Sequence, residues 1–129
     1  MSRAVAIALK IPDNAAYTTL VTLRRLGVDV GRVERAQIVR FEEDVDTAEL
    51  LAAVERDESL YNPNKHRVIA LERDVPRQGE VWIVQDDPAR PIGWRLFSAS
   101  GEPVSASTLA QAAQSLLCNP AVERALFPG

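Results

Sequence analysis

The sequence has little of several residue types that carry chemistry. It contains one cysteine and one histidine in 129 residues, and only 5% of its residues are aromatic. A lone cysteine, Cys118, cannot form an intrachain disulfide, and this cysteine usage is typical of a reducing compartment. A metal site needs several convergent His, Cys or carboxylate ligands, so the composition gives no reason to expect a metal.

The chain also lacks long apolar runs and any concentration of charge of one sign. No stretch approaches the roughly 18 apolar residues that span a membrane, and residues 4–9 are too short for the core of a secretion signal. The 15 Lys and Arg residues and 18 Asp and Glu residues are interleaved. Nucleic-acid-binding domains usually show a clustered basic face. We therefore expect a cytoplasmic protein with neither nucleic acid nor membrane as a partner.

No motif for catalysis or for a cofactor is present. The six glycines are scattered and form neither a dinucleotide-binding nor a Walker pattern. Cys118 ends an apolar helical pattern, where an inert core residue is commoner than a reactive thiolate. His66 stands between Lys65 and Arg67, with no carboxylate beside it in sequence to orient its ring. We therefore assign no catalytic, cofactor-binding or metal-binding residue.

The first third of the chain carries clear secondary-structure signals. The apolar run at residues 4–9 predicts a buried strand. Ala16, Leu20 and Leu23 recur at helical spacing, and Gly27 follows as a left-handed stop. Asp13 or Asn14 supplies the N-cap of this helix. We therefore expect a strand at 4–9, a helix at 15–26 and, from its β-branched residues, a further strand at 32–43.

The stretch from residue 46 to residue 71 predicts a second helix, a turn and a strand. Asp46 and Glu49 have the spacing of a capping box, with the helix fraying after Asp57. Asn62-Pro63 predicts a turn, because the residue before proline avoids helical geometry. The following strand, 67–71, is expected to turn three residues inward: Val68, Ile69 and Leu71.

The second half begins after a polar linker at 73–80. Strands are predicted at 81–84 and 93–97, and Ser105 or Ser107 caps a third helix. Residues 121–127 fit a short strand or one helical turn equally well. The inner face of the third helix is predicted to be Leu109, Ala112, Ala113, Leu116 and Leu117.

The order β-α-β-α-β followed by β-β-α predicts an α+β protein with two layers, and a ferredoxin-like layout is the natural expectation. The segment SLLCNPAVERALF near the C-terminus repeats the pattern of the segment around Asn62-Pro63, with Asn119-Pro120 at the matching place. We therefore expect a unit at 1–72 and a partial repeat at 81–129, packed as one compact domain on the same or an adjoining sheet.

Five residues are candidates for contacts with a partner or ligand. Large aromatics on short strands serve either as core or as interface anchors, and both roles stay open for Trp82 and Trp94. Arg40 and Arg67 suit a sheet edge or a partner contact, and His66 lies in a loop before a strand. An open sheet edge also favours pairing with another copy, so we expect a homo-oligomer.

Residues 4–71 resemble the PurS family, the small subunit of multi-subunit phosphoribosylformylglycinamidine synthase. The resemblance rests on AVAIALK, on the helix end LRRLGV, on the strand RVERAQIVRFE and above all on LYNPNKHRVIAL. It implies a PurS-like sandwich and a non-catalytic subunit that dimerises through its sheet. It also implies that this subunit joins a glutaminase to a large ATP-using synthetase in purine biosynthesis.

Two other functions fit the same fold. A small-molecule-binding regulatory module would have a polar pocket at a dimer interface near His66 or Arg67. A cofactor-free enzyme of the dimeric α+β barrel type would need a cavity holding Tyr17, Tyr61 or His66. The partial repeat adds one hypothesis, that the C-terminal unit takes the place of half of a dimer partner.

Overall fold

The structure is a computed structural model that describes residues 3–42 and 46–128. Its order of elements confirms the predicted α+β class and adds a short final strand, which decides between the two alternatives for residues 121–127. The elements are β1 (Arg3–Leu9), α1 (Asn14–Arg25), β2 (Arg32–Phe41), α2 (Thr47–Arg56), β3 (His66–Leu71), β4 (Glu80–Val84), β5 (Ile92–Phe97), α3 (Ala106–Ala112), the π-helical turn η1 (Ala113–Leu117) and β6 (Arg124–Leu126).

All six strands form one antiparallel sheet in the order β3-β1-β2-β5-β4-β6. In the first half, β2 and β3 flank β1, and α2 connects them. In the second half, β5 and β6 flank β4, and α3 connects them. Each half is therefore a split β-α-β arrangement. The two halves meet where β2 pairs with β5, at the middle of the sheet.

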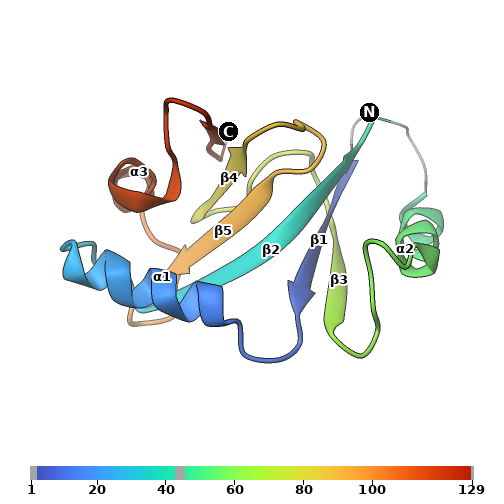
Figure 1. Ribbon diagram of the computed structural model, residues 1–129, viewed down its shortest axis with the longest axis horizontal. Helices are drawn as coiled ribbons and strands as arrows, with labels where there is room; N and C mark the ends of the chain where they lie inside the picture. Colours follow the sequence, from blue (N-terminus) through green and yellow to red (C-terminus); the bar gives the residue numbers. More distant parts are fainter. Residues whose placement is uncertain (1–2, 43–45, 129) are drawn as a thin grey trace.

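The helices cover one face of this sheet (Figure 1). Leu23 of α1 and Leu109 of α3 pack with Val33 and Leu96 of the sheet in one cluster. The helix α2 packs on the other end of the same face, over residues of β1 and β2. Side chains alternate along a strand, so the remaining residues of each strand point to the opposite face.

The linker between β3 and β4 covers part of that opposite face and runs behind the sheet in Figure 1. Arg40 of β2 holds it with two bonds to Asp74, at 2.8 and 3.0 Å. Pro76 of the linker is buried. Trp82 is wholly buried in the cluster on this side of the sheet, so it is a core residue of the chain.

The two Asn-Pro turns have the same hydrogen bonds. In each, the asparagine carbonyl accepts from the N–H four residues on, at 2.8 Å. The Oδ1 atom accepts from the N–H two residues on, at 2.9 Å for Asn62 and 3.1 Å for Asn119. The asparagine N–H donates to a side chain four residues on, to His66 Nδ1 at 3.0 Å and to Glu123 Oε1 at 2.8 Å. The sequence echo is therefore also a structural one.

Four details of the sequence-based expectations are wrong. Ile69 is 44% exposed, because it lies on the edge strand β3 and on the face without helices. Leu116 is 40% exposed, because the π-helical turn shifts the helical phase, whereas Leu117 is buried as predicted. Glu80 was placed in the polar linker, but it begins β4 and is buried.

The capping box is the fourth difference. Asp46 occupies the N-cap position with an extended backbone, but its side chain makes no capping bond to the described residues. The main-chain bond from Leu50 N–H to Asp46 O, at 2.9 Å, begins the helix instead. Glu43, the predicted end of the preceding strand, lies outside the described residues.

Candidate functional site

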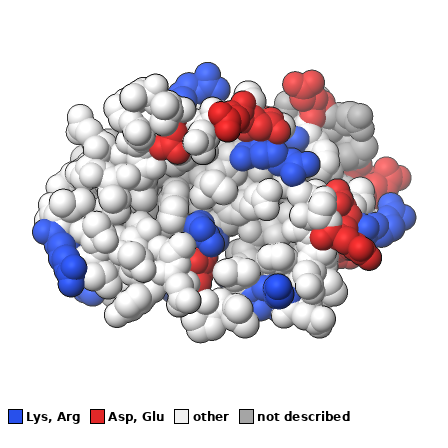
Figure 2. Space-filling view, viewed as in Figure 1, with Lys and Arg blue, Asp and Glu red and all other residues white. Residues whose placement is uncertain are grey.

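The middle of the helix-covered face is hollow. Two adjoining cavities, of about 260 and 460 Å³, share Arg35 and Ile92 in their walls. We call them together the central depression. In Figure 2, which shows the molecule from the side of Figure 1, a basic side chain lies next to an acidic one near the middle of the view, among mostly uncharged atoms.

The fold leaves this depression open for a simple reason. The helices α1 and α3 cover one end of the face, and α2 covers the other. A helix connects β1 to β2 in the first half, but only the loop 85–91 connects β4 to β5 in the second. The second half therefore has one helix fewer, and the sheet between the helices stays uncovered.

Two polar residues of β2 form the floor of the depression. Arg35 and Gln37 lie on the same face as Val33 and Val39, because the four alternate along the strand. Sequence reasoning did not select Arg35 or Gln37. The signal was present: the phase that turns the two valines toward the helices also turns Arg35 and Gln37 toward them.

Asp13 fixes the position of Arg35. One oxygen of Asp13 accepts from the N–H groups of Ala15 and Ala16, at 3.0 and 3.2 Å, and so caps α1. The other oxygen accepts from Arg35 Nε at 3.1 Å. The Asp13 side chain is 15% exposed and that of Arg35 is 37% exposed. The carboxylate therefore ties the start of α1 to the floor of the depression.

His66 lies in the wall of the smaller cavity, at the start of β3. Its Nδ1 accepts a hydrogen bond from the backbone N–H of Asn62. An amide N–H can only donate, so the neutral ring carries its proton on Nε2. The Tyr61 ring lies beside it, with 6.3 Å between ring centroids. The Asn-Pro turn thus sets the tautomer of the only histidine in the sequence.

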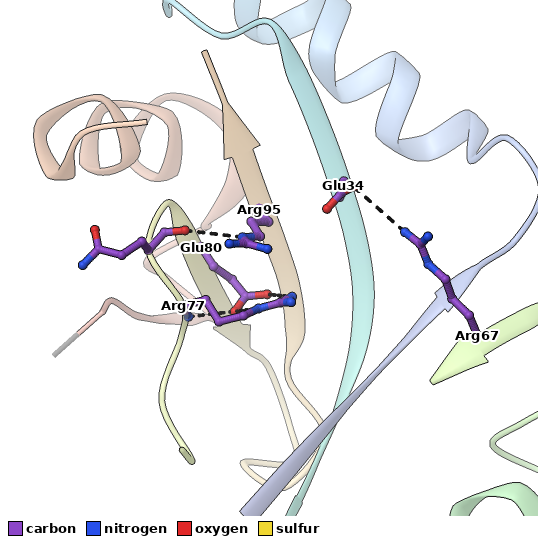
Figure 3. Close-up of polar contacts among 6 residues, drawn as sticks. Glu34, Arg67, Arg77, Glu80 and Arg95 are labelled. Carbon is purple, nitrogen blue, oxygen red and sulfur yellow. Dashed lines mark hydrogen bonds and ion pairs between the residues drawn. The ribbon is translucent and has the colours of Figure 1, made fainter. Parts of the chain in front are cut away.

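The face without helices carries a cluster of charged side chains (Figure 3). The buried carboxylate of Glu80 accepts from Arg77 Nη2 at 2.8 Å and from Arg77 Nε at 3.2 Å. Arg95 Nε donates to a linker carbonyl at 3.4 Å. Farther along, Arg67 lies 4.0 Å from Glu34 across the intervening strand. We call Arg67, Arg77 and Arg95, with Arg32, the arginine cluster.

Phe97 lies among these arginines. The guanidinium carbons of Arg32 and Arg95 stand 4.1 and 5.0 Å from the centre of its ring. Burial lowers the pKa of Arg95 from its ordinary value, and the positive charge of Arg77 lowers it further. The arginine cluster thus holds four arginines beside two carboxylates, Glu34 and Glu80, although the chain as a whole has a net charge of −3.

The five residues selected from the sequence lie on opposite faces of the sheet. His66 and Trp94 line the central depression, on the helix-covered face. Arg40, Arg67 and Trp82 lie on the other face. Both Arg40 and Trp82 make contacts within the chain there. Arg40 bonds to Asp74 of the linker, and its guanidinium carbon lies 5.6 Å from the centre of the Trp82 ring. Arg67 is the most accessible of these three.

The remaining candidate, Tyr17, lines neither cavity of the central depression. Tyr17 is 68% exposed on α1. Within residues 3–42 and 46–128, no three His, Cys, Asp or Glu residues gather to hold a metal ion. In the same part of the chain, no helix is long and apolar enough to cross a membrane.

Comparisons with known proteins found no match, either among protein-family models or among curated proteins.

Proposed function

We propose that this chain is a non-catalytic, PurS-like interaction module. In this proposal it is the small subunit of a phosphoribosylformylglycinamidine synthase and bridges the glutaminase and large synthetase subunits in purine biosynthesis. One observation carries the proposal. The segment that most resembles the PurS family, residues 60–71, folds as a hydrogen-bonded Asn-Pro turn leading into a strand, and its echo at 117–126 folds with the same bonds.

The way in which the two halves join supports the same proposal. PurS-like subunits are expected to dimerise through their sheets. Here β2 and β5 pair over Arg32–Gln37 and Ile92–Phe97 and so join two split β-α-β arrangements in one sheet. We infer that the second unit, 81–129, occupies the place of a dimer partner of the first unit, 1–72. A ferredoxin-like origin of each unit agrees with its split β-α-β arrangement.

The arginine cluster is the surface that we assign to partner docking. Arginine is enriched at the centres of protein interfaces, where its fork pairs with carboxylates. The Arg67 side chain is 55% exposed and its distance to Glu34 is long, so it remains available to a partner. An acidic surface on one of the synthase subunits would complement this face.

The test is the mass of the purified chain mixed with both synthase subunits, with ADP and glutamine present. A ternary complex that restores glutamine-dependent turnover is expected. The double variant Arg67→Glu/Arg95→Glu should weaken association at least about tenfold, because each reversal replaces an attraction by a repulsion. The matched control Arg24→Glu/Arg25→Glu makes the same charge change at the exposed end of α1 and should assemble normally.

The proposal would be contradicted if the chain bound neither the glutaminase nor the large synthetase subunit. Equal loss of assembly in the two double variants would instead rule out the arginine cluster as the docking surface and would leave the proposed synthase role standing.

A second function is favoured by one observation. The central depression is a polar pocket beside His66, at the junction of the two halves, which is where a small-molecule-binding regulatory module would have its site. Ligand-dependent rises in the melting temperature would support it. The third alternative, a cofactor-free enzyme, requires a turnover that is lost when His66 is changed.

A further inference from the structure

We propose that the smaller cavity of the central depression binds the carboxylate or phosphate group of a small organic anion. The apolar part of this molecule would lie on Ile7, Leu9 and Ile92. This inference rests on the small-molecule alternative and not on the synthase role, and it names the chemistry that the cavity recognises.

The sheet places His66 and Arg35 on the two strands that flank β1. Leu9 of β1 pairs with His66 of β3. Ile7 pairs with Gln37 at the last pair of the β1–β2 ladder, and Arg35 lies two residues from Gln37 on the same face of β2. Two strand spacings of about 4.8 Å separate β3 from β2, and both side chains line the smaller cavity. That separation leaves room for one small group between the two side chains.

The polar groups that remain for a ligand in this cavity are mostly donors. His66 presents its Nε2–H, because Nδ1 already accepts from the Asn62 N–H. Among contacts with the described residues, Arg35 uses only its Nε on Asp13, so its two Nη groups remain to donate. The Gln37 amide adds two further N–H groups.

The acceptor in the wall is already used. Asp13 accepts from two backbone N–H groups and from Arg35, so its charge is balanced within the protein. The wall of the smaller cavity therefore combines balanced charge with several N–H groups, whereas the carboxylates of Asp86, Asp87 and Glu123 line only the larger cavity. Charge-assisted bonds from arginine to carboxylate or phosphate are among the strongest that such a wall can form.

The apolar wall fixes the other half of the ligand. Ile92 is 37% exposed in the middle of the sheet and belongs to both cavities. Ile7 and Leu9 continue this surface. The smaller cavity of about 260 Å³ shares Arg35 and Ile92 with the larger one of about 460 Å³, and cavities of this size suit a metabolite rather than a single ion. We therefore expect an anion with a short apolar chain or ring.

The test follows the imidazole of His66 by nuclear magnetic resonance, because the sequence contains no other histidine. The full chain is titrated with hexanoate in one series and with hexyl phosphate in another. Both should shift the His66 ring signals with saturation, and the tighter of the two identifies the anionic group. The nitrogen shifts of the free protein should show the proton on Nε2.

Single variants test which side chains of the cavity bind the anion. Arg35→Gln should weaken binding at least about tenfold, because it removes a charged donor. Arg35→Lys keeps the charge and should retain part of the affinity. Gln37→Leu should weaken binding by a smaller factor. Arg67→Gln is the matched control: it follows His66 in sequence but points to the other face, so it should bind like the parent protein.

Three results would overturn the inference. They are an unperturbed His66 at the highest soluble concentration of both probes, a free ring protonated on Nδ1, and equal loss of affinity in Arg35→Gln and Arg67→Gln. None of them bears on assembly with the synthase subunits, so failure of this site and failure of the synthase role are distinguishable.

Discussion

At the scale of single residues, Glu80 is a buried charged side chain whose stability in the fold depends on its ion pair with Arg77. It is 1% exposed and accepts from the Arg77 backbone N–H at 2.9 Å as well as from the Arg77 guanidinium. Replacing Arg77 by alanine removes the guanidinium and leaves a buried carboxylate with one bond. We expect Arg77→Ala to lower the free energy of unfolding by about 2–4 kcal/mol in urea denaturation.

Arg67→Ala is the control for this prediction. Its ion pair with Glu34 is 4.0 Å long and both side chains are substantially exposed. Surface pairs contribute little, so Arg67→Ala should change the free energy of unfolding by less than about 1 kcal/mol. An equal loss of unfolding free energy in Arg77→Ala and Arg67→Ala would show that the burial of Glu80 does not determine the cost of removing its partner.

Cys118 gives a prediction about pH. Burial raises the pKa of its thiol above the ordinary value, and the negative charge of Glu123 raises it further. A raised pKa means that less thiolate is present at a given pH. Alkylation of Cys118 by iodoacetamide should therefore be slower than that of a free cysteine at pH 8, with its rate rising only at higher pH.

The isosteric variant Glu123→Gln tests the cause of this shift. It removes the charge and keeps an oxygen that can accept from the Asn119 N–H. The pH profile of alkylation should move to lower pH in Glu123→Gln. An unchanged profile would mean that burial alone sets the pKa of Cys118.

At the scale of elements, the three helix starts provide a graded test of capping. Asp13 accepts from two helix N–H groups and from Arg35, Ser105 accepts from the Thr108 N–H at 3.3 Å, and Asp46 makes no such bond to the described residues. Replacing Asp13 by alanine should lower the free energy of unfolding by about 2 kcal/mol, and replacing Ser105 should lower it by about 1 kcal/mol. Replacing Asp46 should lower it by only about a few tenths of a kcal/mol. Urea unfolding of the three single variants measures this order.

Each substitution shortens one side chain at the start of one helix, so the three variants control for each other. A cost at Asp46 equal to that at Asp13 would show that the capping box forms in solution. A negligible cost at Asp13 would remove its role in joining α1 to Arg35.

Local signals predicted the elements well, because their physical causes lie within a few residues. Asp13 caps α1, Gly27 follows it with φ of 85°, and Asn62-Pro63 turns the chain before β3. Burial was less predictable where it depends on distant elements. Ile69 looks like a core residue in sequence, but no helix covers its side of β3.

The candidate site shows the same limit. His66 was selected from the sequence as a loop residue, and it lines the smaller cavity from the first position of β3. Arg35 and Gln37 were not selected for it, because their role depends on which face of β2 the helices cover and on the missing helix between β4 and β5. Neither fact is local to β2. A polar residue in the inward phase of a predicted strand is the pattern that would have identified both.

At the scale of the whole molecule, the two halves share a core. The largest cluster joins Leu23 and Val33 of the first half to Leu96 and Leu109 of the second. The ladder between β2 and β5 continues beyond the strand pairs through main-chain bonds from Ile38 and Arg40 to the loop before β5. A chain of this size with one continuous sheet and a shared core is expected to unfold in a single step.

Two natural probes test this cooperativity. Both tryptophans, Trp82 and Trp94, lie in the second half, and the single histidine, His66, lies in the first. Tryptophan fluorescence and the His66 resonance should report the same midpoint in urea. Gly93→Ala at the junction should lower both midpoints together. Its new Cβ would meet Ile38 Cδ1 at 3.0 Å, and such overpacking costs about 1–3 kcal/mol. If fluorescence and resonance gave separate midpoints, or if Gly93→Ala moved only one of them, the halves would be independent domains rather than one fused unit.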